Sequence, residues 1–242
     1  GFDSGKFRAR AYCAVLFRVG FEPILIADDP DVRKEVVAVS DFRVADNPVS
    51  TLVDTLTSLK ISGKVGFAGS DFFPMKYWNE LQKITPNLTW EICDNLVRAQ
   101  RLIKSEEEQE VIRIGGQIAS PAMTRMMKAL LSGKTEAEAA GLAAHDIVSA
   151  GGVIDKIQVS HGDTIGFTCG DPLTGYRKVA PNSGDLFRAF LIGPMYQGYY
   201  LDPGRTAVCG NKPSSDQINI LEACENIISS MAASIKPGVS FE

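Results

Sequence analysis

The fold is decided by one stretch of strand-like sequence, Gly184–Thr206, which reads GDLFRAFLIGPMYQGYYLDPGRT. Its apolar residues are grouped over Asp185–Ile192 and Met195–Tyr200, which is typical of strands with at least one buried face. Asp202-Pro203-Gly204 is good turn chemistry, because Pro presets a turn dihedral angle and Gly accepts a positive φ. The pattern therefore predicts antiparallel strands joined by short turns.

Helices are predicted on both sides of these strands. Capping boxes, in which Ser or Thr is followed three residues later by Glu or Gln, begin at Ser105, Thr135 and Ser214. The first of these helices carries apolar residues at three- and four-residue spacing, and Pro121 is expected to kink it. Further strands are expected over Val153–Val159, Thr164–Thr168 and Thr206–Cys209. Helices, a run of strands and another helix describe an α+β domain.

The N-terminal region alternates short strands with helices, as a small α/β unit does. Strands are expected over Tyr12–Val19, Glu22–Ala27, Lys64–Ala68 and Leu88–Ile92, and helices over Val49–Leu59 and Met75–Ile84. The composition changes at about Asp94–Ile103, where basic residues lead into the first capping box. We therefore expect one domain over residues 1–96 and a second over residues 97–242.

The composition excludes several classes of protein. The 242 residues include 25 Lys and Arg and 29 Asp and Glu, which gives a net charge of −4, and 45% are hydrophobic. Because there is no basic cluster, we expect no nucleic-acid partner. Because no apolar run approaches the ~18 residues of a membrane span, we expect no membrane partner. Small solutes or short peptides are the expected ligands.

The cysteines indicate the redox environment of the protein, and the start of the chain indicates whether the sequence is complete. The five cysteines are odd in number and never at C-x-x-C spacing, which favours free thiols in the cytoplasm over disulfides or a zinc knuckle. The chain has no initiator Met and opens on Gly1-Phe2, which is typical of a strand end. We expect the sequence to be a fragment.

Four short motifs follow one another in the stretch that opens this section: Gly184-Asp185, Gly198-Tyr199, Asp202 and Arg205-Thr206. Their order resembles the creatinase and aminopeptidase P (Xaa-Pro peptidase, M24) superfamily, which has the pita-bread fold. Further likenesses occur in family order at Gly1-Phe2, Glu22–Ile26, Arg101–Glu108, Gly133–Glu136 and Ile235–Gly238. The resemblance implies an α+β protein: a creatinase-type α/β N-terminal domain whose start is missing, then the first half of a pita-bread domain.

The same resemblance implies a centre of two divalent ions held by two Asp, one His and two Glu. Hard cations prefer such oxygen-rich ligand sets. Counting from either side of the motif places the first metal-binding Asp at Phe190 or Leu191, and no carboxylate lies between Asp185 and Asp202. We therefore expect no metal cofactor, with Mn, Co or Zn as the alternative, and Asp202 as the ligand if a metal binds.

Three residues are candidates for catalysis. His161 follows a predicted strand at a turn and has a side chain suited to proton transfer at neutral pH; Asp163 is a candidate partner for its ring. Asp202 matches the second metal-binding Asp of the family, and its alternative role is a turn residue. Tyr176 lies where the family has a histidine and is a candidate proton donor, with a solvated loop as the alternative.

Four residues are candidates for substrate binding. Arg188 shares a strand face with Leu186 and Phe190, so it is expected to project towards the position of the family's metals and bind a carboxylate there. An arginine on an edge strand is the alternative. Arg177 is a second candidate for a carboxylate, and the motif matches add Tyr199 and Arg205.

Three functions fit these observations. The first is a hydrolase that cleaves a C–N bond in a small nitrogenous compound without metal, as creatinase does; the Pro194-Met195 and Gly198-Tyr199-Tyr200 segments resemble that branch. The second is a metal-dependent Xaa-Pro aminopeptidase or dipeptidase. The third is a catalytically dead peptide-binding module. The resemblance also implies a homodimer.

Overall fold

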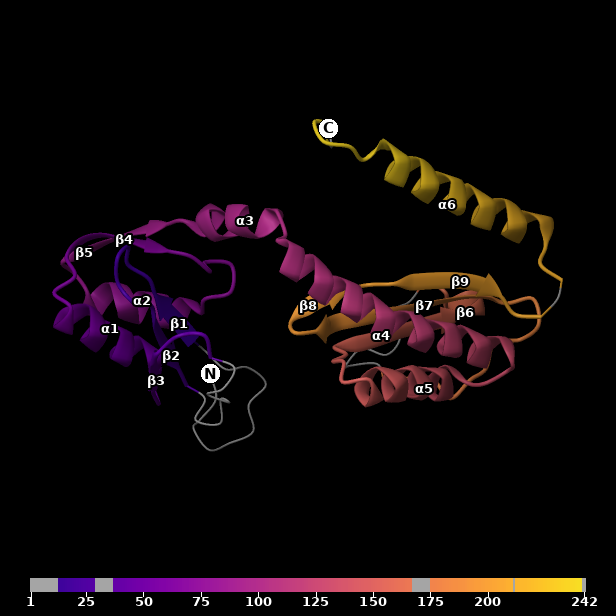
Figure 1. Cartoon of the computed structure of the whole chain (residues 1–242). Coiled ribbons are helices and arrows are strands. Elements are labelled where there is room, and N and C mark those ends of the chain that lie inside the picture. Colours follow the sequence, from indigo (N-terminus) through magenta and orange to yellow (C-terminus); the bar gives the residue numbers. More distant parts are fainter. Residues whose placement is uncertain (1–12, 29–36, 167–174, 211, 241–242) are drawn as a thin grey trace. The chain divides into compact units, whose positions relative to one another are not determined.

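A computed structural model describes residues 13–28, 37–166, 175–210 and 212–240 of the chain. The chain divides into two compact units, Gly1–Ile103 and Lys104–Glu242 (Figure 1). Helix α3 (Asp94–Leu102) is continuous and belongs to the first unit. The division therefore follows α3, whereas the expected boundary between residues 96 and 97 lies inside this helix.

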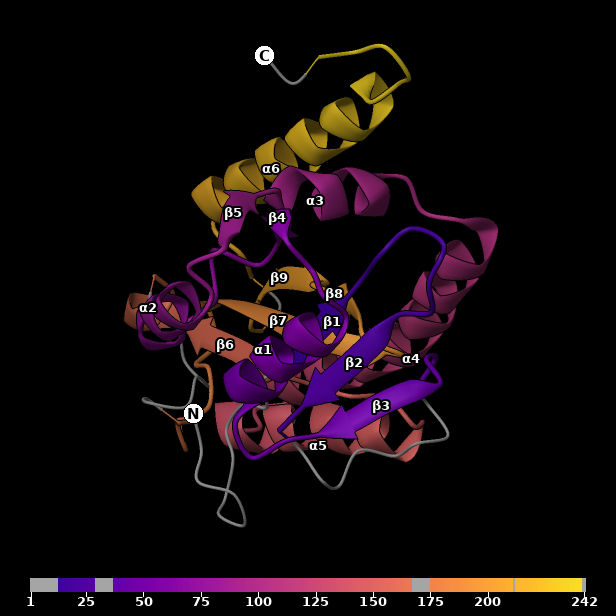
Figure 2. The same cartoon turned by 90° about the vertical axis from the view of Figure 1, so that its left-hand side faces the viewer.

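The first unit is a small α/β assembly, as predicted. Its strands are β1 (Cys13–Leu16), β2 (Ile24–Ala27), β3 (Asp41–Val44), β4 (Gly63–Phe67) and β5 (Leu88–Ile92). Its other helices are α1 (Pro48–Ser58) and α2 (Met75–Ile84). β1 and β2 are antiparallel, β3 lies parallel beside β2 (Figure 2), and β4 and β5 form a separate parallel pair. A turn that includes Gly20, with a φ of 80°, connects β1 to β2.

Two long helices begin the second unit where the capping boxes predict them. They are α4 (Glu106–Leu131) and α5 (Glu136–Ser149). Ser105 and Thr135 each accept a hydrogen bond from the backbone N–H three residues later, and Glu108 and Glu138 close the two boxes. α4 continues as a single helix through Pro121. Its buried residues lie mainly in its second half, where it packs on α5.

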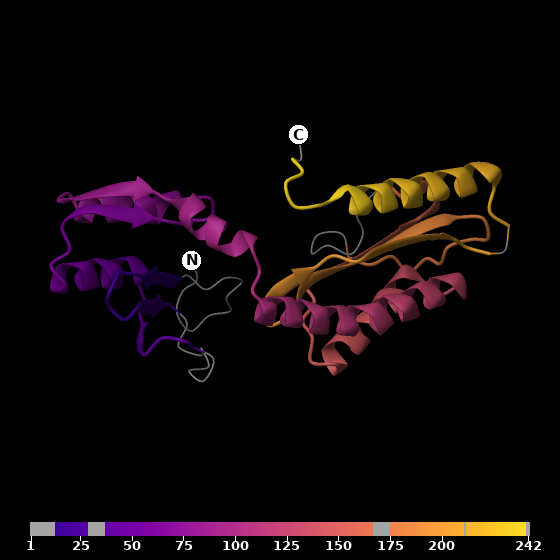
Figure 3. The ribbon, with the colours of Figure 1, turned by 45° about the horizontal axis from the view of Figure 1, so that its top comes forward.

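The predicted strands form one antiparallel sheet around a long central strand. The strands are β6 (Lys156–His161), β7 (Leu186–Tyr196), β8 (Tyr199–Leu201) and β9 (Gly204–Val208). β7 pairs with β6 on one side and with β8 and β9 on the other. α4 and α5 cover one face of this sheet (Figure 3). The fold class predicted from the sequence is thus confirmed.

Alternation along β7 separates the two faces of the sheet. Phe187, Ala189 and Leu191 are fully buried against the helices, together with Met126 and Leu130 of α4. The intervening Leu186, Arg188 and Phe190 are only partly buried and point to the opposite face. Burial of one complete set of alternating residues fixes the register, since a shift of one residue would expose the whole set.

Two details of the predicted strands were wrong. Met195–Tyr200 is not one strand, because Gln197 and Gly198 both have positive φ and make a tight hairpin turn between β7 and β8. Thr164 belongs to a short 3₁₀ helix, η2 (Gly162–Thr164), and Ile165 continues in right-handed helical geometry. Thr168 lies outside the described residues.

The last helix, α6 (Ser215–Ser234), starts at the third predicted capping box. Gln217 ties its first turn to the sheet by donating from Nε2 to the carbonyl of Gly184, 2.8 Å away. None of its residues is buried. Among the described residues, no helix combines the length and the apolar character that crossing a bilayer requires.

Candidate functional site

The face of the sheet opposite α4 and α5 carries Arg188 with a hydroxyl side chain on each neighbouring strand. Residues directly opposite one another in an antiparallel pair point to the same face. Arg188 is opposite Ser160 of β6 and Thr206 of β9, and Phe190 is opposite Gly204. We call the surface made by these five residues the Arg188 face.

Arg188 is held on this face by contacts on two sides. Its Nε donates a hydrogen bond to the hydroxyl of Ser160 across 3.1 Å. Its guanidinium carbon lies 5.8 Å from the centre of the Phe190 ring, within the range of a cation–π contact. The expectation that Arg188 shares a face with Leu186 and Phe190 agrees with the burial pattern of β7. Its role towards a substrate stays a prediction.

Phe190 and Leu191, the two positions where the family resemblance places its first metal-binding Asp, lie on different faces of the sheet. Leu191 is fully buried in the core between the sheet and the helices. Phe190 is on the Arg188 face, and its ring covers Gly204 so closely that a Cβ on Gly204 would lie 2.4 Å from a ring carbon. An aromatic ring therefore occupies the surface of β9 next to the Asp202 turn.

His161 lies on the other face of the sheet. It is opposite Phe187, which is fully buried under the helices, and its own side chain is 5% exposed. Its Nδ1 is 2.6 Å from Oε1 of Glu136, the first residue of α5, which is fully buried. The partner of the ring is thus Glu136, whereas Asp163 is exposed. This placement makes His161 part of the packing between β6 and α5.

Glu136 is a buried carboxylic acid that was not predicted from the sequence to lie beside His161. Burial raises the pKa of its carboxyl, while the hydrogen bond with His161 and the charge of Arg177 act in the opposite direction. Its second oxygen is buried and has no hydrogen-bond partner in the part of the chain that the structure describes. A glutamate in the first turn of a capped helix is normally exposed, so no sequence signal marked it as buried.

Arg177 and Tyr176 belong to a segment that docks on the start of α5. The backbone N–H groups of Glu136 and Ala137 donate to the carbonyls of Val179 and Arg177, at 3.1 and 3.0 Å. Nη1 of Arg177 lies 3.7 Å from Oε1 of Glu136 and also donates to Thr164. Burial raises the pKa of the Tyr176 phenol, partly offset by a backbone hydrogen bond with Ile157. These contacts place both side chains beside β6 and α5.

The remaining candidates lie near the two ends of β8. Tyr199 donates from its hydroxyl to Oε1 of Glu108, 2.6 Å away, and so ties β8 to the capping box of α4. Asp202 is exposed in the connection between β8 and β9. Arg205 is opposite Ala189, on the helix side of the sheet, and donates to the carbonyl of Gly204. The structure therefore does not gather the seven predicted site residues into one cluster.

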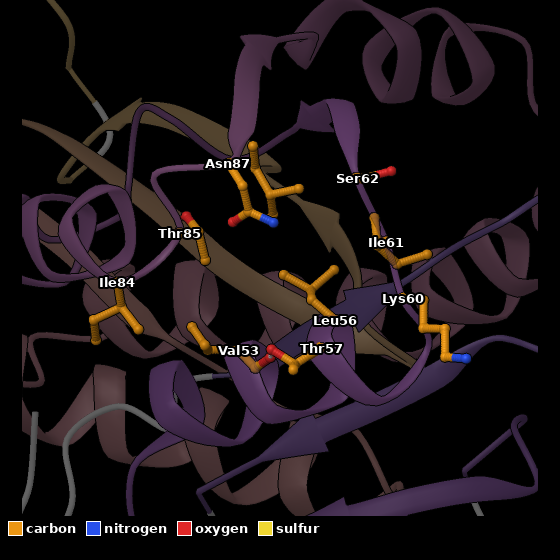
Figure 4. A pocket seen from close by; sticks show the side chains of 10 residues that line it. Val53, Leu56, Thr57, Lys60, Ile61, Ser62, Ile84, Thr85 and Asn87 are labelled. Carbon is orange, nitrogen blue, oxygen red and sulfur yellow. Dashed lines mark hydrogen bonds between the residues drawn. The ribbon is translucent and has the colours of Figure 1, made fainter.

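A separate hollow lies in the first unit (Figure 4). It has a volume of about 240 Å³ and is lined by the end of α1 and the turns before β4 and β5. Leu56 and Ile61 give it an apolar wall, and Thr85 at its edge is buried and accepts a hydrogen bond from the Trp90 indole. Its lining includes the amine of Lys60 but no carboxylate, histidine or cysteine, so it offers none of the side chains that usually bind a metal.

Comparison with known proteins shows the family to which the chain belongs. Residues 110–242 match the metallopeptidase family M24. This match covers more than half of the chain, and the chain belongs to this family. The resemblance stated from the sequence motifs is therefore confirmed.

The similar proteins include Xaa-Pro peptidases. A Xaa-Pro dipeptidase of Pyrococcus horikoshii is 28% identical over 176 residues, which cover 69% of this chain and 46% of that protein. The structure of a Bacillus anthracis Xaa-Pro dipeptidase matches with a TM-score of 0.74 at 19% identity, over 96% of this chain and 64% of the other. For an X-Pro aminopeptidase of Thermotoga maritima the TM-score is 0.66 at 18% identity, over 88% and 61%. The two structures show a shared fold. The chain spans about half the length, or less, of the curated relatives it matches.

The family name raises the question of whether these residues suit a metal centre. Within the described ranges, no three His, Cys, Asp or Glu side chains are close enough to hold an ion together. On the Arg188 face, the side chains of Arg188 and Phe190 offer no oxygen donor to a divalent ion. The exposed Asp202 adds one carboxylate. The donor set of the described residues does not fit a two-metal centre.

Proposed function

We propose that this protein hydrolyses a C–N bond in a small nitrogenous compound or short peptide, and that it does so without the usual dinuclear metal centre. The observation that carries the proposal is the position of Arg188, half-buried on the sheet face that the helices leave uncovered. A guanidinium binds a carboxylate through two parallel hydrogen bonds. Arg188 then binds the carboxylate of the substrate.

The other candidate residues take different parts in this proposal. Tyr176 keeps its proton at neutral pH, because a phenol ordinarily ionises only near pH 10 and its pKa is raised here, and it can donate a hydrogen bond to a substrate oxygen or nitrogen. Asp202 is an exposed carboxylate two residues before Gly204, which the Phe190 ring covers, and it is the candidate acid–base group. His161, Tyr199 and Arg177 are each engaged with a buried or capping glutamate, and we assign them structural roles.

A second function is favoured by the names of the relatives. Two of the similar proteins are a Xaa-Pro dipeptidase and an X-Pro aminopeptidase. In this alternative the protein is a metal-dependent Xaa-Pro peptidase, in which Asp202 is one ligand of Mn, Co or Zn. Such ions would supply a bound hydroxide as nucleophile. The two functions differ in the number of ions the protein retains.

Metal stoichiometry separates the two functions. The longest natural form of the protein is incubated with manganese, cobalt or zinc, desalted and analysed for metal content. We expect less than one tightly held ion per chain, together with turnover of at least one compound from a panel of amidines, lactams and Xaa-Pro dipeptides. Two retained ions per chain would return the protein to the metal-dependent peptidases. Absence of turnover in both metal-loaded and metal-free protein would favour a peptide-binding module.

A further inference from the structure

The segment of residues 175–179 is docked on the start of α5 by main-chain hydrogen bonds. The first backbone N–H groups of a helix have no acceptor within the helix. In α5 the N–H groups of Glu136 and Ala137 donate to the carbonyls of Val179 and Arg177, at 3.1 and 3.0 Å. The segment therefore supplies acceptors that the helix itself lacks, and it is fixed at two of its residues.

The side chain of Arg177 fastens the same segment at a second place. Its Nη1 lies 3.7 Å from Oε1 of Glu136 and donates to the hydroxyl of Thr164 in η2. That hydroxyl uses its single proton to donate to the carbonyl of His161, 2.8 Å away, so it can only accept from Arg177. The ring of His161 contacts Oε1 of Glu136 through Nδ1 at 2.6 Å. The four residues thus form a closed set of contacts between α5, β6, η2 and the segment.

The carboxyl of Glu136 favours the docked position of Arg177. It is fully buried, and within the described part of the chain its Oε2 has no hydrogen-bond partner. A buried carboxylate is unfavourable unless hydrogen bonds or an opposite charge compensate it. The guanidinium of Arg177, with its side chain 34% exposed, supplies that charge. Attraction between the two groups therefore holds the segment against α5.

Tyr176 precedes Arg177 in this segment, and its phenol makes a backbone hydrogen bond with Ile157 of β6. Burial raises the pKa of this phenol and the bond with Ile157 lowers it, as a bond that the phenol oxygen accepts does. The hydroxyl proton is then left for a second partner. We propose that Glu136 and Arg177 are positioning residues, which set the hydroxyl of Tyr176 beside β6 for a hydrogen bond to a substrate. The substrate's part in this rests on the proposed function.

The chain offers matched controls on both sides of the contact. Lys178 follows Arg177 in the segment and is exposed. Arg177→Met and Lys178→Met each replace one basic side chain by an unbranched apolar one. Glu136→Gln and Glu138→Gln each remove one carboxylate from the first turn of α5, and glutamine at position 138 keeps the capping box. Arg177→Lys keeps the charge and tests rescue.

The first measurement reports on docking and needs no ligand. The amide of Ala137 is bonded to the segment and not within α5, so its hydrogen exchange reports on the docked segment. We expect Arg177→Met to accelerate this exchange at least roughly tenfold and Glu136→Gln to act in the same direction. Lys178→Met and Glu138→Gln should leave it unchanged. Unaltered exchange in Arg177→Met, or equal acceleration in Lys178→Met, would overturn the inference.

The second measurement reports on Tyr176 itself. The nuclear Overhauser contact between its ring and the amide of Ile157 is recorded in wild type and in the folded variants. Arg177→Met should weaken this contact, Arg177→Lys should restore part of it, and Lys178→Met should leave it as in wild type. An unchanged contact in Arg177→Met would show that Tyr176 is held without Arg177 and would refute the positioning role.

The third measurement tests whether Arg177 acts on turnover through Tyr176. Hydrolysis of glycyl-proline is followed, with circular dichroism to verify that each variant is folded. Tyr176→Phe and Arg177→Met should each lower kcat at least roughly tenfold, and the double variant should be no slower than Tyr176→Phe. Lys178→Met should keep the wild-type kcat.

The outcomes separate this inference from the proposed function. If the two losses in kcat multiply in the double variant, Arg177 acts independently of Tyr176 and the inference fails. If the wild-type protein does not hydrolyse glycyl-proline, the role of Tyr176 towards a peptide substrate fails. The exchange of the Ala137 amide and the contact with Ile157 still decide whether Arg177 sets the position of Tyr176.

Discussion

At the scale of single residues, the buried contact between Glu136 and His161 is expected to contribute strongly to stability. Both side chains are buried, and a distance of 2.6 Å joins their polar atoms. Replacing Glu136 by Ala leaves the imidazole buried without its partner, which typically costs about 3 kcal/mol in the free energy of unfolding. Urea denaturation measures this loss. Glu110→Ala is the control, because that glutamate is exposed and its ion pair with Arg113 should contribute less than about 1 kcal/mol.

The same carboxyl predicts a dependence of stability on pH. Because burial raises the folded-state pKa of Glu136 above its ordinary value of 4.5, the folded chain holds this proton more tightly than the unfolded chain. The stabilisation from this group is complete below pH 4.5 and is lost as the pH rises through the raised folded pKa. We expect the free energy of unfolding of wild type, relative to Glu136→Gln, to fall as the pH is raised from about 4 to 7. Parallel curves for the two proteins would contradict this.

At the scale of secondary-structure elements, the pairing of β7 with β9 depends on the fit between Phe190 and Gly204. A Cβ at position 204 would lie 2.4 Å from the Phe190 ring, so the ring must move in Gly204→Ala. Overpacking of this kind typically costs about 1–3 kcal/mol. Phe190→Ala combined with Gly204→Ala should cost less than the sum of the two single changes, since the small side chain removes the clash. A double-mutant cycle by urea denaturation measures this coupling, and strict additivity would refute it.

At the scale of the whole molecule, we predict a homodimer, as the family resemblance implies. Large apolar side chains are exposed along α6, among them Ile227, Ile228 and Met231. Exposed apolar groups of this extent often mark surfaces that a partner covers. Light scattering on the longest natural form should give twice the mass of one chain. A mass equal to one chain at micromolar concentration would contradict the prediction.

The candidate site shows which contacts can be predicted from the sequence and which cannot. Alternation along β7 correctly placed Arg188 and Phe190 on one face, because the period of a strand is a local property. The same reasoning named His161 and Tyr199 as site residues but missed their partners, Glu136 and Glu108, which are distant in sequence. It also missed Ser160, which is buried and donates a hydrogen bond to the carbonyl of Ile165.

The sequence by itself determined most of the elements, the capping boxes, the α+β class and the family, because periodicity, caps and short motifs are read within one segment. It did not predict β3 or α3. Two local features were predicted wrongly as strand. Gln197-Gly198 forms a hairpin turn, which the glycine could have indicated, and Thr164 belongs to a 3₁₀ turn. Only the tertiary structure decided the face on which each polar residue lies. Strand registry joins Arg188 to Ser160 and Thr206, and helix packing joins His161 to Glu136. These contacts depend on burial and pairing between segments far apart in the chain, where no local pattern specifies the partner.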